Sequence, residues 1–259
     1  MIVQKIPRFE SGNILSREML EALNFNCLSE RRMNYFGYSD GIVKGLSVTA
    51  SAEYVTVGKG CYLFDREVQY VMEDVKVPYA YGNEMKLLVL RTGDKEVSRQ
   101  FETREAEIKL IGKDERILTD IEICRFSIQN GARLRDYARN LSDMSTYYDT
   151  ICVCHAQWAA YENPSAAYPV LLQFAKELAM CKNLTTEDNL IIGQILELKG
   201  ESLSKQCIEA YVSHKLQHEF KADSAYKLYT GLCEALKLAK NSRQRMERRA
   251  IPERRIIVD

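Results

Sequence analysis

Long apolar runs are absent from this sequence of 259 residues. It has no stretch of about 18 consecutive apolar residues, so we expect no membrane insertion. The N-terminus lacks the apolar core and the small-residue cleavage site of a secretory signal. A net charge is absent as well, because 36 lysines and arginines balance 36 aspartates and glutamates. A neutral chain has no overall attraction to nucleic acid, so we do not expect nucleic acid as a partner.

The cysteines indicate a reducing compartment. The chain has eight of them, and without a secretion signal they are typical of free thiols in the cytoplasm. Cys181, Cys207 and Cys233 lie within apolar periodic segments, where a free cysteine behaves as a small hydrophobic residue. We therefore predict a cytoplasmic protein.

Motifs of the common catalytic sites are missing. The chain has no Gly-x-Ser-x-Gly sequence of the nucleophile elbow. The glycine pairs Gly41/Gly45 and Gly58/Gly60 do not continue as Gly-Lys-Ser or Gly-Lys-Thr, so they indicate turns and not phosphate-binding loops. Carboxylates are scattered over loop and helix-cap contexts and form no convergent group. We therefore predict that the protein is not an enzyme.

Histidine is scarce, with three in the chain. His214 and His218 are four residues apart, a spacing that suits metal binding on one helix face. Cys152, Cys154 and His155 form the other candidate cluster. On a helix, residues two positions apart point roughly 200° apart, so at most one of these cysteines could join His155. Structural zinc needs four convergent ligands, so we predict neither a metal nor any other cofactor.

The first half of the chain has the alternating pattern of β-strands. Eight short segments rich in β-branched and aromatic residues show it: 46–50, 54–57, 61–64, 67–71, 75–80, 85–90, 106–111 and 121–128. Turn signals separate several of them, at 58–60, 81–83 and 92–94. Strands at this spacing predict an antiparallel β-sandwich over residues 1–130.

Near Gly131 the period becomes helical. Apolar and aromatic residues then follow in steps of three and four: Leu134, Tyr137, Leu141, Met144, Tyr148, Ile151, His155 and Trp158. This seam of about four heptads predicts a long helix, which Asn163-Pro164 ends. Two interpretations remain open. The seam is either the core face of a helix within one subunit, or a neck that also joins subunits of an oligomer.

Four further helices are expected over about 169–181, 185–200, 203–221 and from 223 onward. Short connections predict antiparallel neighbours, so residues 131–241 form a helical bundle and the fold class is α+β. A basic tail, 242–259, carries Arg243, Arg245, Arg248, Arg249, Arg254 and Arg255. We interpret it as a solvated helix end, where positive charge is favourable. Contact with nucleic acid or acidic lipid is the alternative.

A helix over about residues 17–36 is predicted ahead of the first strand. Ser16 suits the N-cap, and Leu15 and Leu20 have the spacing of a hydrophobic staple. Gly37 stands where this helix would end. The residues expected to pack this helix are Leu15, Leu20, Leu23, Cys27 and Leu28. A helix with one apolar stripe must bury it, and the sandwich is the expected partner.

Four motifs around this helix occur in a distinctive order. They are Ser11-Gly-Asn-Ile-Leu-Ser, Tyr35-Phe-Gly-Tyr, Gly41-Ile-Val-Lys-Gly-Leu-Ser-Val and Val57-Gly-Lys-Gly-Cys-Tyr-Leu-Phe-Asp-Arg-Glu-Val. In this order, the segment resembles the N-terminal shoulder of the TssK family, trimeric baseplate proteins of type VI secretion systems. It is also similar to the shoulders of siphophage receptor-binding and contractile-injection baseplate proteins. The family-like turn comprises Phe36, Gly37, Tyr38 and Gly45.

The resemblance implies a structural protein of a baseplate, acting by protein–protein assembly. It implies a shoulder sandwich with a helical neck, a homo-oligomer that is a trimer, other baseplate proteins as partners, and a place in the cytoplasm or in a phage-like particle. The chain departs from the family in lacking the histidine-bearing start. It is also shorter than TssK, so we expect no C-terminal head that contacts a membrane complex.

Two other functions are open. One is a β-sandwich binding module for carbohydrate or protein, with the helices as an oligomerisation domain. The other is an enzyme whose site lies between the halves. A deep pocket lined by convergent histidine, cysteine or carboxylate groups would indicate the enzyme.

Overall fold

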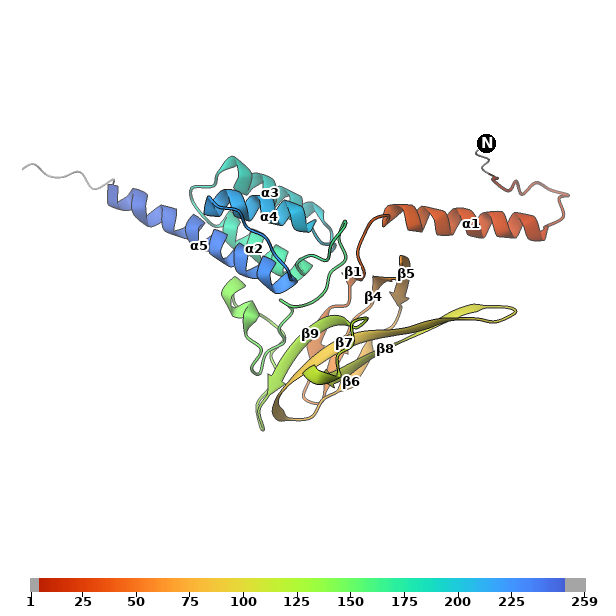
Figure 1. Ribbon diagram of the computed structural model, residues 1–259, viewed down its shortest axis with the longest axis horizontal. Helices are drawn as coiled ribbons and strands as arrows, with labels where there is room; N and C mark the ends of the chain where they lie inside the picture. Colours follow the sequence, from red (N-terminus) through yellow and green to blue (C-terminus); the bar gives the residue numbers. More distant parts are fainter. Residues whose placement is uncertain (1–4, 250–259) are drawn as a thin grey trace, which may run out of the picture.

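The computed structural model describes the backbone of residues 5–249 and the side chains of residues 5–241. Within that range one helix precedes nine strands, and four helices follow them (Figure 1). All pairings between these strands are antiparallel. The predicted α+β class, with antiparallel sheets before helices, is therefore confirmed.

The strands form three sheets of three strands each. The first has the order β1-β4-β5 (Gly41–Gly45, Gly60–Phe64, Glu67–Val71), the second β2-β3-β6 (Val48–Ala50, Tyr54–Val57, Val75–Pro78) and the third β8-β7-β9 (Glu102–Gly112, Gly82–Val97, Ile121–Ile128). Each of the eight segments predicted from alternation overlaps one of these strands. β1 lies outside them because Ile42 and Val43, between its two glycines, are adjacent apolar residues and do not alternate with polar ones.

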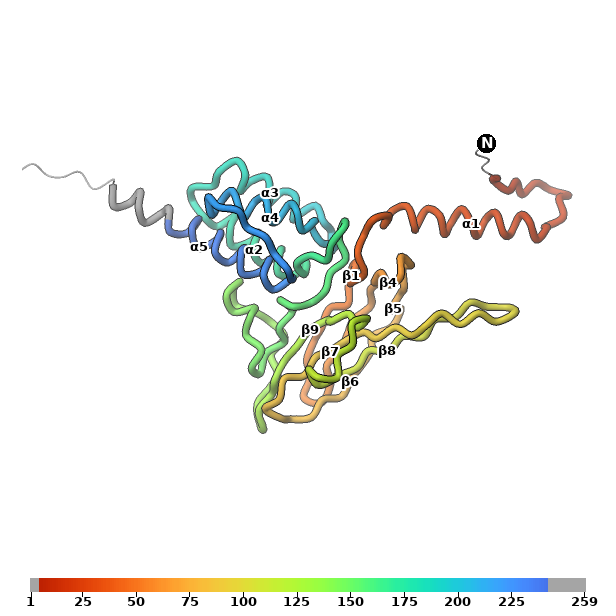
Figure 2. The backbone as a smooth tube through the Cα atoms, in the orientation of Figure 1, coloured from red at the N-terminus to blue at the C-terminus, as the bar shows by residue number. Residues whose placement is uncertain are grey.

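β7 and β8 form a long hairpin whose tip extends away from the other strands (Figures 1 and 2). The tip lies at residues 98–101, where the Phe101 N–H donates to the Ser98 hydroxyl at 2.9 Å. The turn predicted at 92–94 is wrong, because these residues lie inside β7. There the register shifts between Thr92 and Lys95. Gly93 thus belongs to a bulge, which interrupts the ladder without ending the strand.

The helices α2 (Tyr168–Ala179), α3 (Thr186–Glu197), α4 (Lys205–Leu216) and α5 (Ala225–Arg249) pack on one another beside the sheets (Figure 1). They confirm the four predicted helices, with shorter bounds for the first three. Thr185 caps α3 in a reciprocal pair with Asp188, which satisfies two backbone donors. The predicted basic tail lies outside the described residues, apart from the backbone of α5 up to Arg249.

The long helix predicted over residues 134–158 is wrong. Between β9 and α2, residues 129–167 are mostly irregular and contain one short 3₁₀ helix, Leu141–Ser145. We call residues 129–167 the connecting segment. Its backbone bonds to strands: Arg125 N–H donates to Cys152 O at 3.0 Å, and Ile42 N–H to Gln157 O at 2.8 Å. Carbonyls used in this way are not available to the i→i−4 ladder of a helix.

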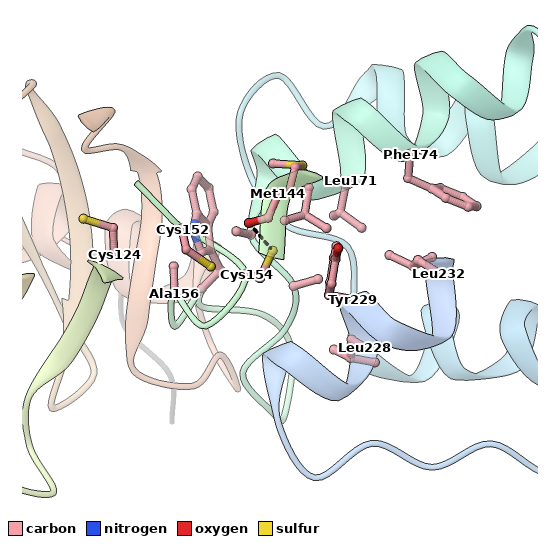
Figure 3. Packing of buried hydrophobic residues seen from close by; sticks show 14 of the residues in the cluster. Cys124, Met144, Cys152, Cys154, Ala156, Leu171, Phe174, Leu228, Tyr229 and Leu232 are labelled. Atoms are coloured by element: carbon pink, nitrogen blue, oxygen red, sulfur yellow. Dashed lines mark hydrogen bonds between the residues drawn. The ribbon is translucent and has the colours of Figure 1, made fainter. Parts of the chain in front are cut away.

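One hydrophobic core runs through both halves of the molecule. The connecting segment supplies its middle layer, with Cys152, Cys154 and Ala156 between Cys124 of β9 and the helical residues Leu171 and Leu232 (Figure 3). Since these side chains are all at most 1% exposed, the segment joins the sheets to the helices.

Candidate assembly surfaces

α1 (Arg17–Asn34) projects from the molecule and does not lie on a sheet (Figure 1). It starts as predicted, with the Met19 N–H donating to the Ser16 hydroxyl at 3.2 Å. None of its residues is buried. The expectation that its apolar stripe packs on the sandwich of the same chain is therefore wrong. The reason is its direction: its contacts with the sheets lie near its C-terminal end, where Arg31 stacks over the Tyr70 ring at 5.5 Å.

The five residues expected to pack this helix remain accessible. Leu15, Leu20, Leu23 and Leu28 are between 39% and 57% exposed, and Cys27 is exposed too.

α1 exposes apolar side chains of its own on more than one side. Phe25 and Met33 are each 69% exposed. At 3.6 residues per turn they lie about 140° and 220° around the axis from Leu20. The segment before the helix folds back along it, since the Asn26 amide donates to Lys5 O at 3.0 Å. That segment adds Phe9, which is 61% exposed. α1 and the segment before it thus expose several large apolar side chains to solvent.

The family-like turn attaches α1 to the connecting segment. Gly37 has a φ of +81°, and a Cβ at this position would lie 2.9 Å from the Tyr161 ring. Its carbonyl accepts from the Glu162 N–H at 2.7 Å. The Tyr38 ring meets that of Tyr161 edge to face at 6.5 Å. Phe36 is 75% exposed and extends the apolar surface of α1.

The fourth residue of the turn set, Gly45, lies at the other end of β1. Its φ is +77°, and a Cβ would meet the Lys59 carbonyl oxygen at 2.3 Å. The position therefore requires glycine, because both the left-handed backbone and the close approach to β4 exclude a side chain.

The eight residues of the predicted seam differ in burial. Leu134, Leu141, Met144 and Trp158 are buried in the core, Ile151 and His155 are half-buried, and Tyr137 and Tyr148 are exposed. No helix brings them to one face. Of the two open interpretations, core packing applies to the four buried residues. Contact with another subunit stays a prediction, for which Tyr137 and Tyr148 offer accessible surface.

His155 stacks on Tyr226 of α5, with ring centroids 4.3 Å apart and the rings 3° from parallel. Burial lowers its pKa to about 4, and the nearby positive charges of Arg125 and Arg116 act in the same direction. Both arginines are held in place by the fully buried Glu122, at 2.6 and 2.8 Å. A neutral imidazole is therefore the form that this junction stabilises.

The cysteines near His155 are core residues. The Cys154 thiol donates to the Met144 carbonyl at 3.1 Å (Figure 3). Burial raises the pKa of the Cys124 thiol well above its usual value. His214 and His218 are not on one helix, because α4 ends at Leu216. Among the residues that the structure describes, no three histidine, cysteine or acidic side chains converge as metal ligands.

A cavity of about 340 Å³ lies between β1, β9 and the start of α2. Its lining is mainly apolar and includes Ile42, Leu46, Ile123, Trp158 and Tyr168. Lys44 is the charged residue of the lining, which contains no histidine, cysteine or carboxylate. This cavity therefore lacks the groups that would indicate the enzyme hypothesis.

None of the helices over residues 5–249 combines the length and apolar content needed to cross a bilayer.

No family model matches the chain, and no curated protein does. Solved structures that are similar to it include the following two. A crystal structure of TssK aligns with a TM-score of 0.38 and 8% identity, over 92% of this chain and 72% of that one. A chain of the type VI secretion system TssK-TssF-TssG baseplate subcomplex aligns with a TM-score of 0.35 and 8% identity, over 91% of this chain and 99% of that one.

Proposed function

We propose that the protein is a structural component of a baseplate-like assembly in a contractile injection, secretion or tail machine. It acts through protein–protein contacts and not by catalysis. The observation that carries the proposal is α1, a helix of 18 residues none of which is buried. Most helical stability in proteins comes from packing of an apolar face, so a partner must cover α1. The class of machine comes from the resemblance of residues 11–68 to baseplate shoulders.

The proposal includes an assembly state. Residues 1–130 act as the shoulder and residues 131–241 as the neck of a homo-oligomer, which we propose is a trimer. Other baseplate proteins are its further partners, and it resides in the cytoplasm or in a phage-like particle. α1 supports self-association because its apolar side chains point in several directions, as in a helix that neighbours contact from more than one side.

Replacing Leu20 and Leu23 by serine tests this role of α1. Leu20 is 50% and Leu23 is 43% exposed. Full burial of a leucine contributes about 2 kcal/mol, so covering the exposed half contributes about 1 kcal/mol each. The double variant should therefore associate roughly 30-fold more weakly per helix. Its thermal unfolding as an isolated subunit should change little, because neither leucine is buried there.

The matched control is the same change at Leu190 and Leu196 of α3, which are 63% and 56% exposed. Association is measured by light scattering over a dilution series. Unchanged association of the Leu20/Leu23 variant, or equal weakening of the control, would contradict the proposal. A pull-down with mass spectrometry is expected to recover sheath, tube or wedge proteins.

A further inference from the structure

A cleft lies between the end of α1, the turn joining β4 to β5, and the β7–β8 hairpin. It consists of two cavities of about 610 and 270 Å³. Arg32, Arg66 and Glu67 line both cavities, so the two are adjacent. No motif in the sequence connects these elements, because the groups involved come from three distant parts of the chain.

Two strand edges border this cleft. Residues 66–69, where β5 begins, and residues 102–104 of β8 line it consecutively. The face of a strand contributes only alternate residues, so consecutive residues indicate that the cleft runs along the edges. β5 and β8 are outer strands of their sheets. Each therefore has one edge whose backbone groups pair with no other named strand of the described structure.

The cleft is positively charged in a chain without net charge. Five cationic side chains line it, Arg31, Arg32, Arg66, Lys95 and Arg104, against the three acidic side chains Asp65, Glu67 and Glu102. The net charge of the lining is therefore +2.

Arg66 is the exposed cation at the turn. It holds a left-handed backbone, with a φ of +63°, which is uncommon for a residue with a side chain. Glu67 is already shared, accepting from Arg32 at 3.3 Å and from Lys95 at 3.2 Å. No carboxylate within residues 5–241 forms an ion pair with Arg66 or Arg31. These two cations are thus available to an anionic ligand.

The Arg104 side chain forms part of the wall of the cleft. Its side chain is 8% exposed and donates to Asp65 at 2.9 Å. A second donor of the guanidinium reaches the Phe64 carbonyl at 3.4 Å, and the group lies 5.1 Å over the Phe64 ring. Its Nε has no hydrogen-bond partner in the described part of the chain. A buried donor without an acceptor is unfavourable. This Nε lies below the surface of the wall, so a ligand oxygen reaches it when the Arg104 side chain shifts toward the cleft.

We propose that this cleft binds an extended acidic segment of a partner protein, which pairs with the edge of β5 and places a carboxylate against Arg104. The proposal rests on the proposed function, because it states the chemistry of a partner in the assembly. Leu28, Phe36 and Val68 lie among the cations of the lining. That mixture favours a peptide with alternating acidic and apolar residues over a free anion, since alternation on a strand places all its carboxylates on one face.

The direct test measures binding of fluorescent peptides to the full chain by anisotropy. The probe is an acetylated peptide of four Glu-Val repeats, and the controls are Gln-Val and Lys-Val repeats of the same length. We expect saturable binding of the Glu-Val peptide, at least ten-fold tighter than that of the Gln-Val peptide. Added salt should weaken it, because salt screens exposed charges. Equal binding of the Gln-Val peptide would overturn the proposal.

Variants locate the site. Arg31→Gln with Arg66→Gln removes two cations that have no carboxylate partner. The fold should lose only the stacking of Arg31 over Tyr70, which circular dichroism checks, and peptide affinity should fall at least ten-fold. The matched control is Arg99→Gln at the hairpin tip, outside the lining, which should bind as the wild type does. Arg104→Lys keeps the positive charge but loses the planar guanidinium with its several N–H donors. It should therefore also weaken binding of the Glu-Val peptide. An unchanged affinity of the Arg31/Arg66 variant would overturn the proposal.

Hydrogen exchange separates strand pairing from simple charge attraction. The amides of residues 67–71 should become protected when the Glu-Val peptide binds, and unchanged exchange there would refute the pairing with β5.

Light scattering distinguishes a failure of the cleft proposal from a failure of the proposed function. The Arg31/Arg66 variant should lose the peptide and retain the oligomeric mass. A wild-type monomer that still binds the peptide would refute the assembly and leave the cleft standing.

Discussion

Replacing Gly41 by alanine tests how the connecting segment is held against β1. Gly41 has a φ of +147°, and a Cβ there would lie 2.7 Å from the Ala159 nitrogen and 2.8 Å from the Gln157 oxygen. Both are backbone atoms, so no side-chain rotation relieves the overlap. The contact also carries two hydrogen bonds of 2.8 Å, from Ile42 N–H to Gln157 O and from Ala159 N–H to Ile42 O.

The expected loss of stability follows from these contacts. A side-chain residue held in a glycine-only conformation costs about 1–3 kcal/mol. Losing the two hydrogen bonds adds about 0.5–1.5 kcal/mol each. Gly41→Ala should therefore lower the free energy of unfolding by about 2–6 kcal/mol. For a chain of this size that corresponds to a fall of roughly 10 °C in the melting temperature.

The same substitution at Gly193 is the control. Gly193 lies inside α3, is exposed, and a Cβ there would have no heavy atom within 4 Å. Alanine favours a helix over glycine, so Gly193→Ala should stabilise the protein by about 0.5–1 kcal/mol. Circular dichroism during thermal and urea unfolding measures both variants. If Gly41→Ala unfolds like the wild type, the path of the connecting segment beside β1 is wrong.

Two further predictions concern His155, which is half-buried, and Asp188, which is buried. His155→Phe keeps a ring against Tyr226 but cannot be protonated. The folded-state pKa of about 4 lies below the ordinary 6.5, so the unfolded chain binds more protons between these values. The wild type should therefore lose stability as the pH falls from about 6.5 to 4, by about 1–2 kcal/mol more than the variant after allowance for partial exposure. Urea unfolding at several pH values measures this, and parallel pH profiles would contradict it. Asp188→Ala leaves Lys215, 14% exposed and 2.7 Å from that carboxylate, the Tyr211 hydroxyl and the Thr185 N–H without their common acceptor, and should cost about 3–5 kcal/mol in urea unfolding. Glu187→Ala, an exposed change in the same helical turn, is its control and should cost under about 1 kcal/mol. Equal losses in the two variants would show that the buried Asp188 carboxylate does not stabilise the fold more than an exposed one does.

The helices with local caps could be predicted from the sequence. Ser16 and Thr185 each bond to a backbone N–H three residues ahead, so the signal for α1 and α3 lies within one turn of chain. Gly37 and Gly200 hold positive φ angles just beyond the helices. Such signals fix where a helix begins and ends, but not what covers it, and the projection of α1 was therefore not predictable.

The connecting segment could not be predicted from its spacing. Steps of three and four identify Leu134, Leu141, Met144 and Trp158 as apolar, and these residues are indeed buried. The same spacing does not determine the backbone. That depends on pairing with β1 and β9, such as the bond between Ile42 and Gln157, which are far apart in the sequence.

The cleft has the same origin in long-range pairing. Arg104 meets Asp65 across 39 residues of sequence, and α1 reaches Glu67 from Arg32 across 35. No local pattern marks these residues as a cluster. Only the folding of the two hairpins beside the end of α1 brings their charges together.

We propose that another copy of the chain covers α1. Light scattering of the purified protein at micromolar concentration is the decisive test of this proposal. The expected mass is three times the 29.8 kDa of one chain. A mass of one chain, unchanged up to the highest soluble concentration, would contradict it.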